Sequence, residues 1–137
     1  KKKNPFKPGT VASSLRVFNF HRNDETQQIL GGLTVDFAPE VEKDIWLWDV
    51  KKKGKKLTNI GYGDCIAVIT GTGKSVEEAV NRMYRNVEKF SFLGAYYRPK
   101  ADYLSFGYST SILNRLNYGM ERGLYQIPFT VKVGIIR

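Results

Sequence analysis

The sequence contains little of the side-chain chemistry on which most metal sites and nucleophilic active sites depend. Its 137 residues include one cysteine, Cys65, and one histidine, His21. A single cysteine excludes an internal disulfide, and one Cys with one His cannot complete a zinc site without carboxylates, so we expect no metal site. A nucleophilic Cys65–His21 pair stays open as an alternative, although Cys65 begins an apolar segment, where cysteine is usually inert packing.

Long apolar runs are also missing. No stretch approaches the roughly 20 residues needed to span a bilayer, and no secretory signal pattern is present. We therefore expect no membrane partner and a cytoplasmic location, with which a lone cysteine agrees. The first residue is Lys1 rather than Met, which suggests a fragment or a processed chain.

Acidic residues are scarce relative to basic ones. The chain has 22 Lys and Arg against 13 Asp and Glu, a net charge of +9, which favours anionic partners. Much of the excess lies at Lys1–Lys3 and in the lysine-rich run Lys51–Lys56, which has the pattern of a β-hairpin tip. Two interpretations of that run remain open: a solvated loop, which is the more common case, and a patch that contacts phosphates.

The hydrophobic periodicity predicts one domain of the α+β class, a small, mostly antiparallel sheet packed with one or two helices. The hydrophobic fraction of 42% and the charged fraction of 26% are ordinary for a globular protein of this length. Residues 1–9 form an extended lead-in, because prolines forbid a helix there. The expected elements are strands at 13–20, 33–37, 45–50, 57–60, 65–70 and 129–136, a helical turn at 40–44, and helices at 75–90 and 109–122.

The segment 75–90 has the clearest local signature. Ser75 can cap the first turn, and Glu78 can complete a capping box three residues later. Apolar residues recur at helical spacing and form a single stripe. The pattern therefore predicts a core-packing amphipathic helix with a basic outer face. Nucleic-acid binding by that face is the minor alternative.

The preceding residues, Gly71-Thr72-Gly73-Lys74-Ser75, resemble the end of a phosphate-binding loop. The complete loop requires a glycine at position 68, which is Val68 here, and the dinucleotide fingerprint requires a glycine at position 76, which is Val76. Both nucleotide-binding interpretations fail. A tight turn into a capped helix is favoured over a weaker anion site at the helix N-terminus.

Arg16 is the candidate binding residue, because a guanidinium within a strand lies either on an exposed sheet face or in a cleft where it binds an anion. The aromatic side chains allow two interpretations. Packing in the core or in a hairpin is favoured, since aromatics dominate core burial, over a surface on which bases of single-stranded nucleic acid stack. The aromatic residues concerned are Trp46, Trp48, Tyr96, Tyr97 and Tyr103.

One stretch resembles a known family. Val68-Ile69-Thr70-Gly71-Thr72-Gly73, Ser75-Val76-Glu77-Glu78-Ala79 and Phe90-Ser91-Phe92-Leu93-Gly94-Ala95-Tyr96-Tyr97-Arg98 are similar to the C-terminal domain of phosphoribosylamine–glycine ligase, an ATP-grasp enzyme of purine biosynthesis. The resemblance covers about residues 10–98 and is strongest over 66–98. It implies an ATP-grasp C-terminal-like domain at 10–98, followed by an extension at 99–137 packed on the same domain.

The resemblance also implies a function. In that family the domain is a small sheet-and-helix module related to the rudiment single hybrid motif, which packs on the ATP-grasp domain and helps cover its active site. ATP and Mg would be bound by that upstream domain, so this chain would not be active alone. Ala12–Val17 is similar to the strand that delivers an arginine to the acceptor site in carboxylase-type ATP-grasp enzymes. Arg16 would therefore help bind a small anionic substrate.

Two other functions remain open from the sequence. The first is a basic nucleic-acid-binding module that uses the lysines of Lys51–Lys56 together with nearby aromatic residues. The second is a sheet-and-helix interaction domain without a ligand.

Overall fold

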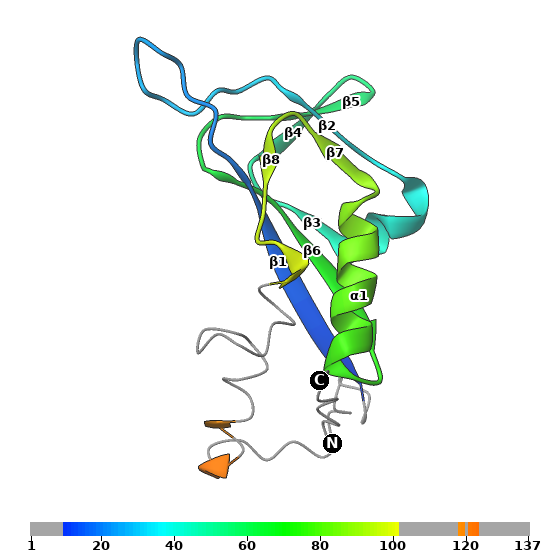
Figure 1. The fold of residues 1–137 in the computed structure, drawn as a ribbon. Coiled ribbons are helices and arrows are strands. Elements are labelled where there is room, and N and C mark those ends of the chain that lie inside the picture. Colours follow the sequence, from blue (N-terminus) through cyan, green and yellow to red (C-terminus); the bar gives the residue numbers. More distant parts are fainter. Residues whose placement is uncertain (1–9, 102–117, 120, 124–137) are drawn as a thin grey trace, which may run out of the picture.

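The computed structural model describes residues 10–101, 118–119 and 121–123 (Figure 1). The described elements follow the order strand, strand, 3-10 helix, four strands, helix and two strands. Their bounds are β1 (Val11–Asn19), β2 (Thr34–Phe37), η1 (Pro39–Asp44), β3 (Ile45–Leu47), β4 (Val50–Lys53), β5 (Lys56–Asn59), β6 (Cys65–Gly73), α1 (Val76–Val87), β7 (Phe90–Phe92) and β8 (Ala95–Tyr96).

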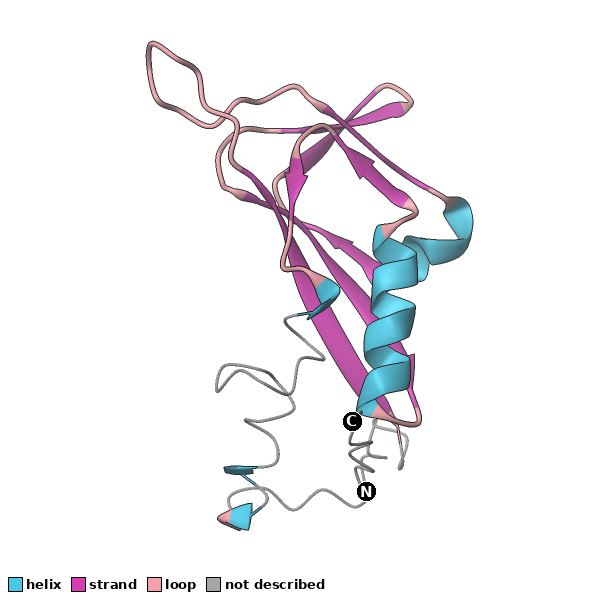
Figure 2. Ribbon diagram, viewed as in Figure 1, coloured by secondary structure: helices cyan, strands magenta, loops and turns pink. Residues whose placement is uncertain are grey.

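The strands form two four-stranded sheets in which every neighbouring pair is antiparallel. The first sheet has the order β3-β6-β1-β8, and the second sheet has the order β4-β5-β2-β7. Helix α1 packs along β6 and β1 and covers one face of the first sheet (Figures 1 and 2). The α+β prediction is confirmed, and the antiparallel strands are divided over two sheets instead of one.

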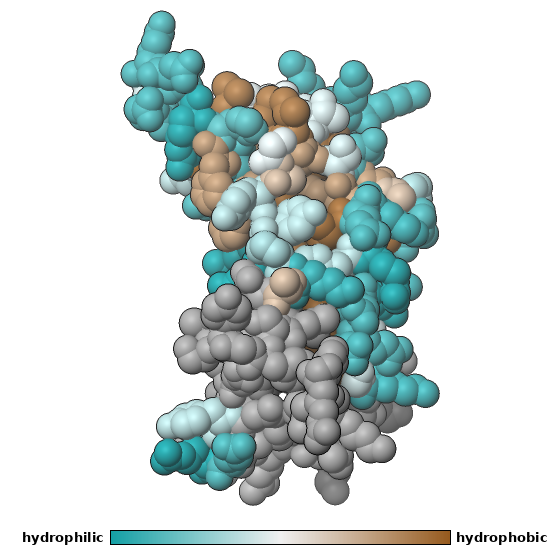
Figure 3. Space-filling model, viewed as in Figure 1, coloured by the Kyte–Doolittle hydropathy of each residue, from teal (hydrophilic) through white to brown (hydrophobic). Residues whose placement is uncertain are grey.

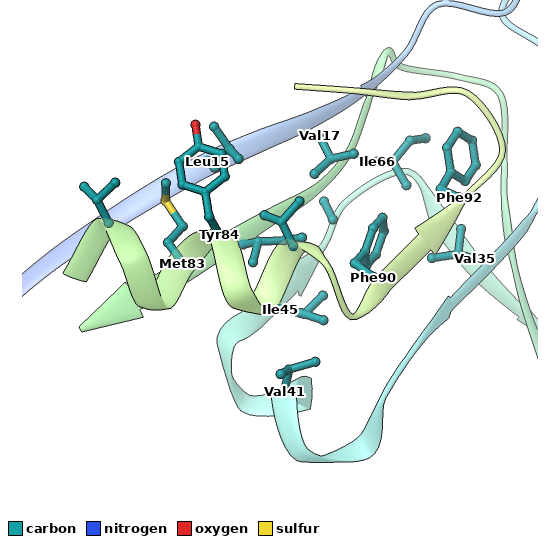
Figure 4. Close-up of a cluster of buried hydrophobic side chains, with 14 of the residues drawn as sticks. Leu15, Val17, Val35, Val41, Ile45, Ile66, Met83, Tyr84, Phe90 and Phe92 are labelled. Carbon is teal, nitrogen blue, oxygen red and sulfur yellow. The ribbon is translucent and has the colours of Figure 1, made fainter. Parts of the chain in front are cut away.

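The hydrophobic core lies between α1 and the first sheet and continues beneath the second sheet. Leu15 and Val17 of β1 belong to this core together with Met83 of α1, and the second sheet contributes Val35 and Phe92 (Figure 4). Each of these side chains is at most 6% exposed. Because burial of one such side chain stabilises a fold by about 1.5–3 kcal/mol, this cluster ties the two sheets and the helix together.

The predicted helix is present but shorter than expected. Ser75 Oγ accepts the Glu78 amide at 3.1 Å, which confirms the predicted cap. The Glu78 carboxylate reaches back to accept the amide of Lys74 at 2.7 Å rather than that of Ser75. The helix ends at Val87, and Phe90 pairs with Phe37 as the first residue of β7, so the predicted end at residue 90 was wrong.

The predicted strand 45–50 is divided between the two sheets. Residues Ile45–Leu47 pair with β6 in the first sheet, whereas Val50 pairs with Asn59 in the second sheet. Between them, the buried Asp49 carboxylate accepts the backbone amides of Gly61, at 2.9 Å, and Tyr62, at 3.1 Å. These bonds fix the crossing, so the interpretation of 45–50 as one continuous strand was wrong.

The remaining predicted elements agree with the structure where it describes them. The predicted strands 13–20, 33–37, 57–60 and 65–70 correspond to β1, β2, β5 and β6, and the helical turn at 40–44 corresponds to η1. The predicted final strand 129–136 and most of the predicted helix 109–122 lie outside the described residues. In the described part of the chain, no helix has the length and apolarity needed to cross a membrane.

Candidate functional site

Arg16 lies on the face of the first sheet that points away from α1. Its neighbours Leu15 and Val17 are buried against the helix, and the alternation along β1 therefore turns Arg16 outward, where it is exposed. Arg16 pairs with Val68 of β6, and Val68 pairs with Trp46 of β3. Since neighbouring strands are about 4.8 Å apart, the backbones of Arg16 and Trp46 are about 10 Å apart in one cross-strand row.

Aromatic side chains lie beside this row. Phe18 follows Arg16 on the same face, and its ring stacks on Phe20 with centroids 5.7 Å apart and planes 4° apart. Tyr96 pairs with Phe18 from β8, and its ring centroid lies 5.1 Å from that of Phe20. We call Phe18, Phe20 and Tyr96 the aromatic cluster. Together with Arg16, Val68 and Trp46 it defines the open face of the first sheet.

The open face is unusually apolar for a solvent-exposed surface. Trp46 is 61% exposed, Phe20 50% and Tyr96 60%. The preference for core packing was therefore wrong for Trp46 and Tyr96, and also for Trp48, which is 69% exposed. Tyr103 lies outside the described residues. Exposed aromatic side chains around a cation are typical of a surface that another molecule or domain covers.

Arg16 forms no ion pair with any described carboxylate, and its charge acts on the thiol of Cys65. Burial raises the pKa of the Cys65 thiol, Arg16 lowers it in part, and Asp64 raises it further. The thiol lies 3.8 Å from the Ala67 carbonyl oxygen. A thiol whose pKa is raised is mostly protonated at neutral pH, so these surroundings do not activate Cys65 as a nucleophile.

The His21 backbone forms two hydrogen bonds, and the His21 side chain packs against a glycine. Its amide donates to the Asn19 side chain at 3.0 Å, and its carbonyl accepts the Leu30 amide at 2.9 Å. The imidazole lies directly against Gly94, where an added Cβ would collide with it. In the described part of the chain, no contact joins the Cys65 and His21 side chains. The structure therefore gives no support to the alternative of a nucleophilic Cys65–His21 pair.

Two buried asparagines that the sequence analysis overlooked fix the loop after β1. The side-chain amides of Asn19 and Asn59 both donate to the Leu30 carbonyl, at 3.0 and 2.8 Å. The Asn59 side-chain oxygen also accepts the Leu33 amide at 2.8 Å. Both residues are fully buried, so this shared acceptor joins the end of β1 to β5. The signal available in the sequence was only the two isolated Asn residues at strand ends.

The glycines of Gly71-Thr72-Gly73 serve helix packing. A Cβ on Gly71 would lie 2.4 Å from the Met83 nitrogen, and one on Gly73 would lie 2.7 Å from the Ala79 nitrogen. The strand continues through Gly73, and the Glu78 carboxylate occupies the position at the helix N-terminus where an anion would bind. The close contacts of both glycines with α1 and the Ser75 cap agree with the favoured interpretation, a turn into a capped helix.

The lysine run forms the predicted hairpin. Residues Lys53 and Lys56 pair across a two-residue turn, and Gly54 at its first position has a φ of 62°. All the lysines of Lys51–Lys56 are exposed. They belong to the second sheet and share no strand with Arg16.

The described residues show no grouping of three or more His, Cys, Asp or Glu side chains that could bind a metal ion.

Comparisons with known proteins include a similar solved structure. No family model matches the chain, and no curated protein matches it. A solved structure of phosphoribosylamine–glycine ligase from Thermotoga maritima is similar to it, with 27% sequence identity and a TM-score of 0.48. The match covers 65% of this chain and 20% of the ligase chain, so the chain corresponds to a small part of that protein. The solved protein bears the name of the family that the sequence resembles.

Proposed function

We propose that this chain is the C-terminal domain of a cytoplasmic, ATP-dependent carbon–nitrogen ligase resembling phosphoribosylamine–glycine ligase. In this proposal it packs on an upstream ATP-grasp domain and covers that domain's active site. ATP and Mg are bound by the upstream domain, where they supply the activation of a carboxylate substrate as an acyl-phosphate. This chain contributes a covering surface and one cationic side chain.

The observation that carries the proposal is the position of Arg16 on the open face. The guanidinium forms no ion pair with the described carboxylates, and it lies between Trp46 on one side and the aromatic cluster on the other. A packed domain would bury those aromatic rings, and in doing so it would remove water from around Arg16. A cation in such surroundings binds an anionic substrate more strongly than one in bulk water.

The sequence of residues 66–98, which resembles the ligase family most strongly, also supports the proposal. These residues form β6, α1, β7 and β8, which together position β1 and hence Arg16. Gly71 and Gly73 let α1 approach β6 closely, so these two glycines of the segment that resembles the ligase have a packing role in this chain.

The proposal is tested by measuring ATP turnover with the gene product's upstream region present and absent. We expect turnover only when an upstream ATP-grasp domain is supplied, because in this proposal that domain binds ATP and Mg. An upstream region without such a domain, or ATP turnover by this chain alone, would overturn the proposal.

The role of Arg16 requires a separate comparison in the complete enzyme. Arg16→Met keeps the length of the side chain and removes its charge. Loss of hydrogen bonds to a charged group costs about 1.5–3 kcal/mol, so KM for the anionic substrate should rise about 10- to 100-fold. Arg85→Met, at an exposed position on the outer side of α1, removes the same charge and should leave KM unchanged. Equal KM values for the two variants would exclude Arg16 from substrate binding.

A further inference from the structure

The β4–β5 hairpin concentrates positive charge on one side of the second sheet. Lys51 pairs with Thr58, and Lys53 pairs with Lys56. Because side chains alternate along a strand, Lys51, Lys53 and Lys56 lie on the same face, opposite to the face on which Leu57 packs against the core. Lys52 and Lys55 add charge at the edge and at the turn. Figure 3 shows hydrophilic side chains projecting around this hairpin.

Lys51, Lys53 and Lys56 lie close to one another. Lys51 and Lys53 are about 6.6–6.8 Å apart along β4, and the Cβ atoms of Lys53 and Lys56 are about 4.5–5.5 Å apart across the strands. Like charges directly opposite one another destabilise a strand pair. No described carboxylate forms an ion pair with any of the five lysines. Asp36 lies on the same face on β2, the strand next to the one that carries Lys56, and its carboxylate accepts the Phe37 amide.

Protection of a sheet edge explains only part of this charge. Lysines on an edge strand prevent pairing with other chains, and β4 is an edge strand of the second sheet. Lys56, however, belongs to β5, which is paired on both sides, and Lys55 lies in the turn. The charge therefore continues beyond the edge that needs protection.

We propose that this hairpin binds the phosphate backbone of nucleic acid through Lys51, Lys53 and Lys56, with Lys52 and Lys55 at its border. A compact group of flexible ammonium groups can contact neighbouring phosphates, each of which carries one negative charge. The exposed Thr34 hydroxyl is in the same cross-strand row as Lys51 and offers a further phosphate contact. The contact reads no sequence, because these groups reach phosphates rather than base edges.

Two other polyanions fit the hairpin less well. A membrane-binding segment normally places Trp, Phe or Leu beside its basic residues, and the Lys51–Lys56 run contains none of these. Carboxylate recognition favours the planar fork of arginine, and the run contains only lysine and glycine.

The test measures binding of two fluorescent probes to the full chain at 50–200 mM salt. The probes are an oligothymidylate of about 20 nucleotides and a duplex of about 20 base pairs. We compare the wild type with the triple variant Lys51→Gln/Lys53→Gln/Lys56→Gln. The control variant, Lys43→Gln/Lys74→Gln/Lys100→Gln, removes the same charge from exposed positions elsewhere. Circular dichroism and Tm establish that each variant is folded.

We expect the hairpin variant to lose about tenfold or more in affinity at low salt. Its slope of log K against log salt should shrink by about 2 for the single strand and by about 2.7 for the duplex, whereas the control should keep both. The probe that the wild type binds more tightly at the same salt concentration identifies the form of nucleic acid that is bound. Equal losses in the two variants would overturn the site, as would binding that does not depend on salt. Binding only to vesicles containing about 30% phosphatidylserine would assign the hairpin to a membrane and refute the proposal.

The result does not depend on the proposed ligase function. The binding assay uses no ATP and no upstream domain, so its failure would leave the ATP-turnover experiment unaffected. Conversely, absence of ATP turnover in the ligase experiment would leave the salt dependence of nucleic-acid binding by the hairpin unchanged.

Discussion

Replacing Gly71 by alanine should strongly destabilise the fold. A Cβ at this position would lie 2.4 Å from the Ala79 carbonyl oxygen and from the Met83 nitrogen, and 2.8 Å from the Met83 Cα. Ordinary van der Waals contact begins at 3.4 Å, so α1 would have to move away from β6 by about 1 Å. The obstructing atoms belong to the backbone of the helix and cannot be relieved by a rotamer change.

The expected cost follows from the kind of contact that is disturbed. Overpacking of a core typically costs about 1–3 kcal/mol, and a rigid helix backbone places Gly71→Ala at the upper end. A loss of about 3 kcal/mol is a large share of the about 5–15 kcal/mol that stabilises a typical domain. It should lower Tm by about 10–20 °C in a thermal melt followed by circular dichroism.

The matched control is Gly63→Ala. Gly63 has no atom within 4 Å of its ideal Cβ position, and its φ is not positive. Alanine there should be neutral or stabilise by about 0.4–1 kcal/mol, because it restricts the unfolded chain. If Gly71→Ala melted at the same temperature as Gly63→Ala, the packing role of Gly71 would be refuted. If Gly71→Ala were stable but lost affinity for phosphate, the phosphate-loop interpretation would return.

Two further predictions concern the helix attachment and the thiol. Asn86→Ala should destabilise the fold by about 1–3 kcal/mol in urea unfolding, because its side-chain amide bonds both Asp44, at 3.2 Å, and the Thr70 carbonyl, at 2.8 Å; an unchanged midpoint would contradict this. Iodoacetamide should alkylate Cys65 more slowly at pH 7.5 than it alkylates free cysteine, and still more slowly in Arg16→Met, because burial raises the thiol pKa and Arg16 lowers it. The folded-state pKa of this thiol is raised. The stability linked to it is therefore present below its usual pKa and is lost as pH rises through the raised value. Faster alkylation of Cys65 in Arg16→Met than in the wild type would contradict the assignment.

Local signals in the sequence were sufficient for the helix and for most strands. Ser75 and Glu78 begin α1 through contacts within four residues, which a sequence pattern can contain. The end of the helix depended on a distant partner. Phe90 continues the apolar stripe at helical spacing, yet it pairs with Phe37, which is more than fifty positions earlier. No local pattern distinguishes these two outcomes.

The same limitation applies to the candidate site. The alternation around Arg16 gave its outward orientation, because Leu15 and Val17 must face the core. The exposure of Trp46 and Tyr96 followed from topology, since α1 covers only one face of the first sheet. Gly71 and Gly73 suggested a turn, whereas the reason for these glycines is close contact with residues of α1 from Glu78 to Met83. Composition alone favoured burial of the aromatic rings.

The crossing at Asp49 decides how the two proposed surfaces relate to each other. If 45–50 were one strand leading into the hairpin, Trp46 and the lysines of Lys51–Lys56 would share a sheet. They would then form one basic and aromatic surface of the kind on which single-stranded bases stack. Instead, the bonds from Asp49 to Gly61 and Tyr62 direct the chain into the second sheet before the lysines begin.

This separation assigns different chemistry to each sheet. The first sheet carries the exposed aromatic cluster and Arg16, which suit a substrate beneath a packed domain. The second sheet carries the lysines, and its aromatic residues Phe37, Phe90 and Phe92 pack in or against the core. Because the aromatic rings of the second sheet pack in or against the core, the lysines should act on phosphates by charge, which should give binding that is steeply salt-dependent and independent of base sequence. A preference of the hairpin for one base over another would therefore require the two sheets to contribute to the same site, which the Asp49 crossing argues against.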